Sequence, residues 1–166
     1  MDRRLRPAGI ALFVVLAFFA FIALILLSAW SYTSLQLALA RSQGVYPSAE
    51  EGMRELLETG YTGITRLDIL YAGPDSSTGR QPHVWYVMAE VRASRRADGS
   101  DLGVRGCDGP GSFFIQTNEG WVHMPEGAFP KVVGQWMDVF GLAGPGQSRP
   151  STDWPESQPN RLCQSA

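Results

Sequence analysis

The chain has 166 residues, of which 45% are hydrophobic and 18% charged, and this suits one small domain with additional segments. Its formal net charge of -2 lacks the basic character that nucleic-acid binding requires, so no nucleic-acid partner is expected. The two cysteines, Cys107 and Cys163, are too few for a framework of several disulfides or for a metal site of four cysteines.

The N-terminal region carries the strongest pattern in the sequence. The twenty residues from Ala8 to Leu27 carry no charge. A helix of this length spans about 30 Å, which is the thickness of the hydrocarbon core of a bilayer. Trp30 and Tyr32 follow, where amphipathic aromatic side chains favour the membrane interface. The sequence therefore predicts a transmembrane signal-anchor helix over residues 7–30, with the lipid bilayer as its partner.

The distribution of arginines predicts the orientation of this helix. Three arginines lie within residues 1–6, and the next basic residue is Arg41. The positive-inside rule makes residues 1–6 a cytoplasmic stub and places the rest of the chain outside, as in a single-pass protein of the cell membrane. The alternative is a signal peptide cleaved near Ser28 and Ala29, although the apolar run is longer than the usual ~7–15 residues. Both alternatives place the residues after 30 outside the cytoplasm.

Two helical segments are predicted next. Residues 31–44 contain no breaker before Gly44, so we expect a juxtamembrane extension of the first helix that ends at this glycine. Ser48 and Glu51 have the spacing of a capping box, which predicts a second helix that runs to about Glu58. This helix would open an extracytoplasmic domain over residues 45–141.

Strand patterns occupy the middle of the domain. Residues 62–72 alternate, and four side chains are expected on one face: Thr65, Leu67, Ile69 and Tyr71. Residues 83–92 form a second strand with apolar residues on both faces, including Trp85 and Tyr86. Such a strand is covered on both sides, lines a cavity or meets a partner.

The second half of the domain is expected to contain a hairpin and a helix. Residues 112–117 and 121–124 are predicted strands, joined by the three residues 118–120, so that Thr117 pairs with Trp121 and Ile115 with His123. Residues 130–140 show helical spacing of apolar residues. The tail, residues 142–166, is rich in proline and poor in apolar residues, and we expect it to be disordered.

This order of elements predicts an α+β fold. An N-terminal transmembrane helix precedes a small exported domain in which helices pack on a curved antiparallel sheet of about four strands. In outline the domain resembles the cystatin and NTF2-like families. That resemblance implies a fold and no function.

Several residues are chemically suggestive. The side chains that could hold a metal are His83, His123, Cys107 and Glu126, but none has diagnostic spacing, so neither a metal site nor a cofactor is predicted. Cys107 and Cys163 could form one disulfide outside the cytoplasm, worth about 4 kcal/mol, and the sequence leaves open whether they do.

Large side chains suggest a ligand-binding function. The candidate residues are Trp85, Tyr86, His83, His123 and Trp121. The alternative is that the aromatic side chains form the core and its contacts with a dimer partner or the membrane. We therefore expect a membrane-anchored partner- or ligand-binding accessory module, in a membrane protein complex or a homodimer. A pilin-like subunit and a small enzyme using His83 and His123 remain as alternatives, although the run that begins at Ala8 lacks the processed Phe and early Glu of pilins.

Overall fold

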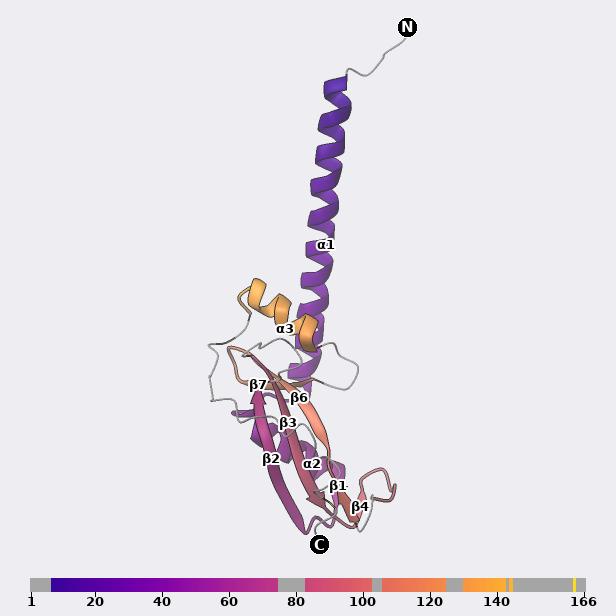
Figure 1. Ribbon diagram of the computed structural model, residues 1–166, viewed down its shortest axis with the longest axis vertical. Coiled ribbons are helices and arrows are strands. Elements are labelled where there is room, and N and C mark those ends of the chain that lie inside the picture. The colour runs from indigo at the N-terminus through magenta and orange to yellow at the C-terminus, as the bar shows by residue number, and fades with distance from the viewer. Residues whose placement is uncertain are drawn as a thin grey trace.

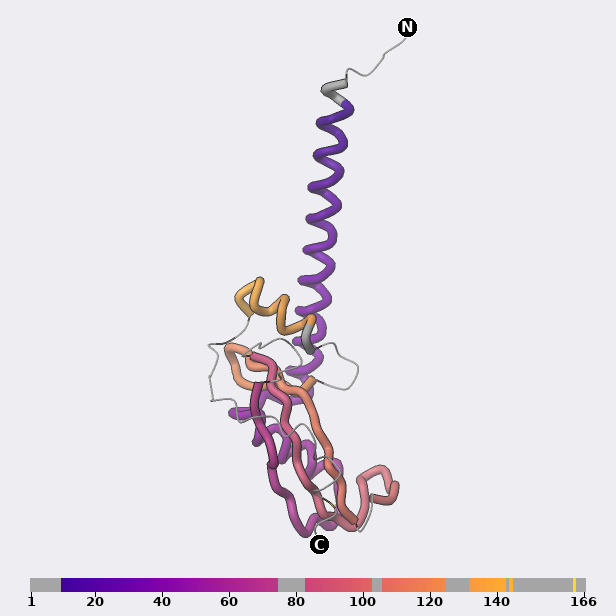
Figure 2. The backbone as a smooth tube through the Cα atoms, in the orientation of Figure 1, coloured from indigo at the N-terminus to yellow at the C-terminus, as the bar shows by residue number. Residues whose placement is uncertain are grey.

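A computed structural model describes residues 7–74, 83–102, 106–124 and 130–142, together with residues 144 and 163. A long N-terminal helix leads into a small α+β domain, and its first half projects away from that domain (Figure 1, Figure 2). The predicted α+β class is confirmed. The predicted stub at residues 1–6 and most of the predicted tail lie outside the described residues.

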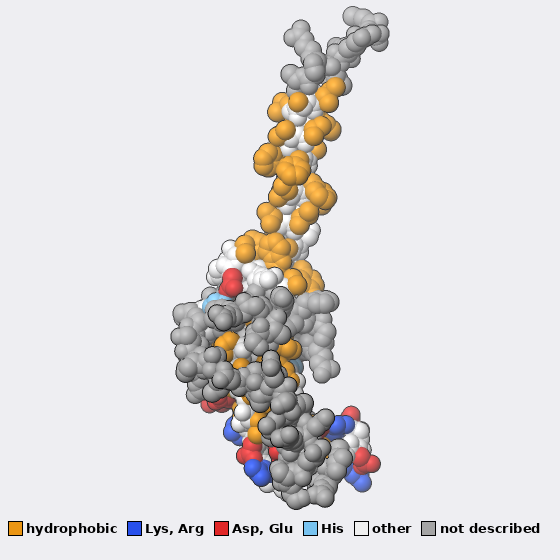
Figure 3. Space-filling view, viewed as in Figure 1, with side chains coloured by type: hydrophobic (Ala, Val, Ile, Leu, Met, Phe, Trp, Pro, Cys, Tyr) orange, Lys and Arg blue, Asp and Glu red, His pale blue; other side chains and the backbone are white. Residues whose placement is uncertain are grey.

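Helix α1 (Pro7–Gln43) is continuous through the apolar run and the residues 31–43 that follow it. No glycine or proline interrupts it after residue 10, and it ends at Gly44, whose φ of 151° disfavours other residues. Its stretch Ile10–Gln43 is long and apolar enough to cross a membrane. Hydrophobic side chains cover the projecting half, as Figure 3 shows in orange.

The last turns of α1 belong to the core of the domain. Leu37 and Ala40 are buried there. Just beyond the helix, Tyr46 forms an isolated bridge with Trp121. The Arg41 side chain lies 3.2 Å from a carboxylate oxygen of Glu119. These contacts leave no free linker between α1 and the domain.

Helix α2 (Ala49–Gly60) begins as the sequence predicts. The Glu51 amide donates to the Ser48 hydroxyl oxygen at 3.1 Å, which satisfies one of the donors left free at a helix start. Met53 and Leu57 are buried on the face of α2 that packs on the sheet.

The main sheet is antiparallel and has five strands, one more than the sequence predicts. Its central order is β2 (Arg66–Pro74), β3 (Val84–Arg92), β6 (Gly111–Gln116) and β7 (Trp121–Met124). The fifth strand, β5 (Cys107–Asp108), pairs with the end of β3. Two short strands, β1 (Tyr61–Thr62) and β4 (Arg95–Arg96), form a separate ladder.

The sheet separates two apolar clusters. On one face, α2 packs against a cluster that includes Trp85, Phe114 and Trp121. On the other face, the end of α1 and helix α3 (Pro130–Val139) pack against a cluster that includes Val84, Ile115 and Val122. Strand β3 is thus covered on both faces near its start, which explains why both of its faces are apolar. Burying a side chain such as Phe114 contributes roughly 1.5–3 kcal/mol.

The predicted face of Tyr71 is wrong, because β2 contains a bulge just before this residue. The register shifts between Ile69 and Tyr71, so Tyr71 pairs with Met88, while Ile69 pairs with Ala89. A bulge adds one residue to one strand and reverses the alternation that follows. Tyr71 therefore lies on the face opposite α2, whereas Leu67 and Ile69 keep the predicted face.

The β6–β7 hairpin is shifted by one residue from the predicted pairing. Thr117 and Gly120 exchange backbone hydrogen bonds of 2.7 and 3.3 Å, so the loop has two residues and not three. Gln116 consequently pairs with Trp121, and Phe114 pairs with His123. This one-residue shift moves His123 to the opposite face from Ile115, and the predicted Ile115–His123 pair is wrong.

Candidate functional site

Two of the predicted ligand-binding residues are packed together in the core. Trp85 and Trp121 are both buried, and their ring centroids lie 4.7 Å apart beneath α2. Their neighbours on β3 and β6 pair in register around them. A ligand would have to displace α2 to reach either indole, so these residues act as core in this conformation.

Tyr86 occupies the other face of the sheet. Its ring packs edge-on against Phe113, with centroids 5.0 Å apart. The ring also lies over Gly111, where a Cβ would overlap the Tyr86 hydroxyl. Tyr86 is half-buried and is separated from Trp85 by the sheet itself.

His123 forms a pair with a serine on the neighbouring strand. The Ser112 hydroxyl oxygen and the His123 Nε2 lie 2.6 Å apart. Burial lowers the pKa of His123, which favours the neutral ring. A neutral imidazole beside a hydroxyl is the arrangement that a nucleophile and its base require. It is also an ordinary cross-strand hydrogen bond between two half-buried side chains.

His83 lies directly before β3 and contacts α3. Its Nε2 is 3.1 Å from an Asp138 carboxylate oxygen, and its Nδ1 is buried without a hydrogen-bond partner in the described structure. The backbone carbonyl of His83 also accepts from the Gln116 amide at 2.8 Å. The contact with Asp138 fixes the rotation of α3 against the sheet.

The two cysteines are joined in a disulfide with a Cα–Cα distance of 5.7 Å. Because Cys107 lies in β5, which pairs with the last two residues of β3, the bond ties residue 163 to that end of the sheet. The bridge is compatible with a location outside the cytoplasm.

A polar cluster surrounds Asp108, next to the disulfide. Its carboxylate accepts from the Tyr61 hydroxyl at 2.8 Å and from the Arg96 guanidinium at 2.7 and 3.0 Å. Burial alone would raise the pKa of Asp108, but the hydrogen bonds from Arg96 and Tyr61 outweigh it and the net pKa is lowered. Burial, followed by the bond to Asp108, raises the pKa of Tyr61 to about 12. The cluster ties β1, β4 and β5 together.

The predicted candidates therefore do not share a site. His83, His123 and Cys107 belong to three separate environments, and Glu126 lies outside the described residues. In the described part of the chain, no three His, Cys, Asp or Glu side chains are grouped so that they could hold a metal ion.

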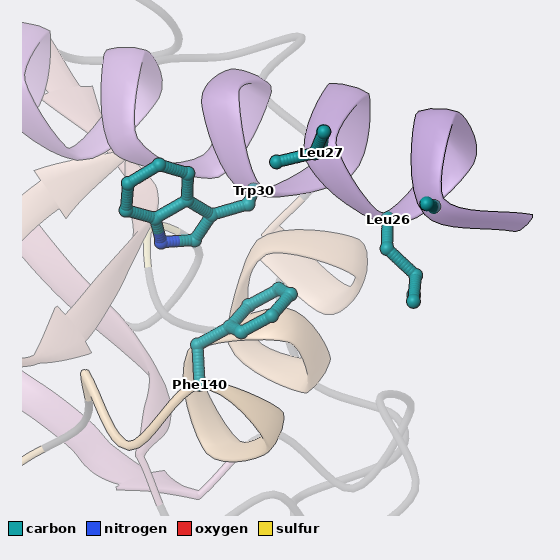
Figure 4. A pocket seen from close by; sticks show the side chains of 5 residues that line it. Leu26, Leu27, Trp30 and Phe140 are labelled. Carbon is teal, nitrogen blue, oxygen red and sulfur yellow. The ribbon is translucent and has the colours of Figure 1, made fainter. Parts of the chain in front are cut away.

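An apolar groove lies between α1 and α3. Its volume is about 400 Å³, and it is lined by Ala23, Leu26, Leu27, Trp30 and Phe140 (Figure 4). Phe140 directly follows α3, and its ring points toward the α1 side chains in this view. Phe140 also stacks on Trp136, with centroids 5.6 Å apart. The groove lies where the apolar stretch from Ala8 to Leu27 ends.

A second apolar feature lies on the outer face of α1, below the predicted span. Tyr32, Leu35 and Leu39 are 38%, 58% and 51% exposed. The domain covers the opposite face of the same turns, where Leu37 and Ala40 are buried. The three exposed side chains are three and four residues apart and form one stripe on the helix.

Sequence reasoning missed both apolar features. The stripe has a sequence signal, since Tyr32, Leu35 and Leu39 have helical spacing beyond the apolar stretch that ends at Leu27. The groove has none, because it depends on where α3 packs. No protein-family model, curated protein or solved structure matches this chain.

Proposed function

We propose that the protein is a single-pass membrane protein whose exported domain is an accessory module that binds a partner helix at the membrane surface. Residues 7–30 anchor it in the bilayer, with the N-terminus cytoplasmic and the domain, residues 45–141, outside. The apolar run, the arginines that precede it and the disulfide support this arrangement. A cystatin- or NTF2-like fold for the domain stays part of this proposal as an analogy in outline, and it carries no function.

The exposed stripe of Tyr32, Leu35 and Leu39 carries the proposal of a partner. A helix that stands in water normally presents polar residues on its outer face. Here the outer face is apolar in the turns that follow the span, while the inner face is occupied by the domain. Apolar residues three and four apart form the seam of helix–helix pairs. A helix of a membrane protein complex, or α1 of a second copy, fits this stripe.

Site-specific photo-crosslinking in the cell membrane tests the partner. A photoreactive amino acid replaces Leu35 or Leu39 in the full chain, and Leu70 serves as the control because it is an exposed leucine on the edge strand β2. We expect crosslinked products of defined mass from positions 35 and 39 and none from position 70. A full chain that yields no product at 35 or 39 contradicts the proposal.

Substitution supplies an independent readout. Leu35→Gln and Leu39→Gln together leave the core untouched, because both side chains point away from the domain. We expect the native assembly, sized in mild detergent, to become smaller with this double change and to keep its size with the control Leu70→Gln. If the assembly keeps its size with all three substitutions, the stripe does not bind a partner helix.

Anchoring has its own test. We expect the full chain to stay in the membrane fraction after alkaline carbonate washing and to have the mass of a chain that retains α1. A soluble mature form beginning near Ser28 and Ala29 would identify the run as a cleaved signal peptide. Removal of a shorter leader, followed by assembly into filaments, would favour the pilin-like alternative.

A small enzyme is the second candidate, because Ser112 and His123 lie 2.6 Å apart and the pKa of His123 is lowered. If Ser112 is a nucleophile activated by His123, a fluorophosphonate probe labels the wild-type chain, and the labelling is lost in Ser112→Ala and His123→Ala. An unlabelled wild-type chain would remove this candidate. His83 contacts Asp138 on a different element, so it is not part of this pair.

A further inference from the structure

We propose that α3 is an interfacial helix: its outward face rests in the lipid of the outer leaflet, and the groove between α1 and α3 holds a lipid acyl chain. The inference rests on the membrane anchoring proposed above and adds a second contact with the bilayer. In this proposal the exported domain itself touches the membrane surface, in addition to being anchored by α1.

The position of α3 is the first argument. α3 packs beside α1 near the level where α1 enters the domain (Figure 1). The groove between them is lined by Leu26 and Leu27, the last residues of the apolar stretch that begins at Ala8, and by Trp30. If residues 8–27 fill the hydrocarbon core, this groove opens at its outer boundary. Amphipathic helices rest at about this depth, with the apolar face about 5–10 Å into the boundary between headgroups and acyl chains.

The distribution of side chains around α3 is the second argument. Val133 and Met137 are fully buried against the sheet. Val132 and Val139, on an outward face, are 40% and 69% exposed. Trp136, which stacks on Phe140, lies at helical spacing between the two valines. The apolar surface of α3 is therefore wider than the packing of the domain uses.

Two contacts fix the orientation of the outward face of α3 relative to the sheet and to α1. The contact of 3.1 Å between Asp138 and His83 holds α3 against the start of the sheet, and the groove holds Phe140 toward α1. The exposed apolar face consequently adjoins the lipid-exposed surface of α1. A contiguous apolar patch on a protein surface marks an interaction site, whereas one exposed valine would not.

The chemistry of the groove favours an acyl chain as its occupant. All five side chains that line it are hydrophobic, and four of them belong to the anchor helix. A polar ligand would find no charged partner on these side chains, while a hydrocarbon chain needs none. The indole N–H groups of Trp30 and Trp136 suit the headgroup level, where tryptophan is enriched in membrane proteins.

Fluorescence quenching by brominated lipids tests this inference. The full chain is reconstituted at low density in phosphatidylcholine vesicles whose acyl chains are brominated near the headgroup. We compare the wild type with Trp30→Phe and Trp136→Phe, because each conservative change removes the signal of one indole. We expect the brominated lipid to quench less fluorescence in each variant than in the wild type. The loss should be of similar size for Trp30→Phe and for Trp136→Phe.

The outcomes separate this inference from the anchoring on which it depends. If Trp30→Phe loses its component and Trp136→Phe quenches like the wild type, the chain is anchored and the inference about α3 is wrong. If neither variant loses a component, the anchoring has failed. If the quenching of Trp136 disappears as the protein-to-lipid ratio rises, a second copy of the chain covers the outward face of α3. That result would overturn the assignment of this face to lipid.

A matched pair of charged substitutions guards against a misfolded Trp136→Phe. Val139→Asp places a carboxylate on the outward apolar face of α3, and Leu70→Asp places one on the exposed edge strand β2. We expect the first change to reduce the quenching of Trp136 at least twofold without altering that of Trp30, and the second to alter neither. Equal quenching in both variants would contradict the proposed contact.

Discussion

The backbone of Tyr46 exchanges two hydrogen bonds of 2.8 Å with the backbone of Trp121. Tyr46 follows α1 by three residues, and Trp121 begins the edge strand β7. The chain that leaves α1 is therefore hydrogen-bonded to the sheet within three residues. Because Leu37 and Ala40 are buried in the same domain, the last turns of α1 and the sheet form one packed unit.

The Tyr46–Trp121 contact predicts that Gly120 cannot be replaced. A Cβ at Gly120 would lie 2.7 Å from the Tyr46 carbonyl oxygen, and its φ of 144° is unfavourable for other residues. We expect Gly120→Ala to lower the free energy of unfolding by about 1–3 kcal/mol. Urea denaturation of the full chain in micelles measures this. Gly109→Ala is the control, since no atom lies within 4 Å of its Cβ position, and equal stability of the two variants would contradict the account.

Two glycines in α2 give a second matched pair. A Cβ at Gly52 would lie 2.6 Å from the Phe114 ring, whereas no atom lies within 4 Å of one at Gly60. Alanine is intrinsically the better helix former by up to about 1 kcal/mol, so Gly60→Ala should be neutral or stabilising. Gly52→Ala should instead cost about 1–3 kcal/mol through overpacking. The denaturation midpoint should fall in Gly52→Ala and should stay the same or rise in Gly60→Ala. A Gly52→Ala variant with a raised midpoint would show that α2 does not pack this closely on Phe114.

The disulfide predicts a strong response to reductant. Cys107 and Cys163 are 56 residues apart, and closing a loop of that length stabilises the folded chain by about 4 kcal/mol in the chain-entropy model. We expect a reductant to lower the stability of the wild type and to leave that of a Cys107→Ser, Cys163→Ser double variant unchanged. Mass spectrometry after alkylation should find modified thiols only in the reduced protein. Two thiols that react without reductant would contradict the bridge.

The raised pKa of Tyr61 predicts that the protein loses stability in alkaline solution. Its folded pKa of about 12 exceeds the ordinary value of 10.0, chiefly because of burial and then the bond to Asp108. The neutral hydroxyl therefore contributes its full stabilisation below pH 10.0 and loses it as the pH rises toward about 12. Tyr61→Phe removes this contribution. The difference in unfolding free energy between wild type and variant should shrink across that window, and a difference independent of pH would contradict the assigned bond.

The sequence was sufficient for features that depend on neighbours along the chain. The Ser48 cap, the end of α1 at Gly44 and the two apolar faces of β3 follow from local spacing. Strand β5 has two residues in a glycine-rich segment and shows no periodicity, so its pairing with β3 has no sequence signal. The bulge that turns Tyr71 likewise has no signal, because it is visible only in the pairing with β3.

The candidate site was less predictable for a related reason. The hairpin loop shortens to two residues where Gly120 lies against Tyr46, a contact between distant parts of the chain. That shift decides the face of His123 and hence its pairing with Ser112. Aromatic content indicated a pocket lined by Trp85 and Trp121, but the two rings pack against each other in the core. Residue type alone does not distinguish a pocket lining from a core.

Protease protection in oriented vesicles tests the central proposal, a retained anchor with an exported domain. The full chain, carrying a C-terminal epitope, is treated with protease in right-side-out and in inside-out membrane vesicles. The account predicts that the epitope is lost in right-side-out vesicles, that residues 7–30 remain as a protected fragment, and that the epitope survives in inside-out vesicles. An epitope protected in right-side-out vesicles, or a domain released without any protease, would contradict it.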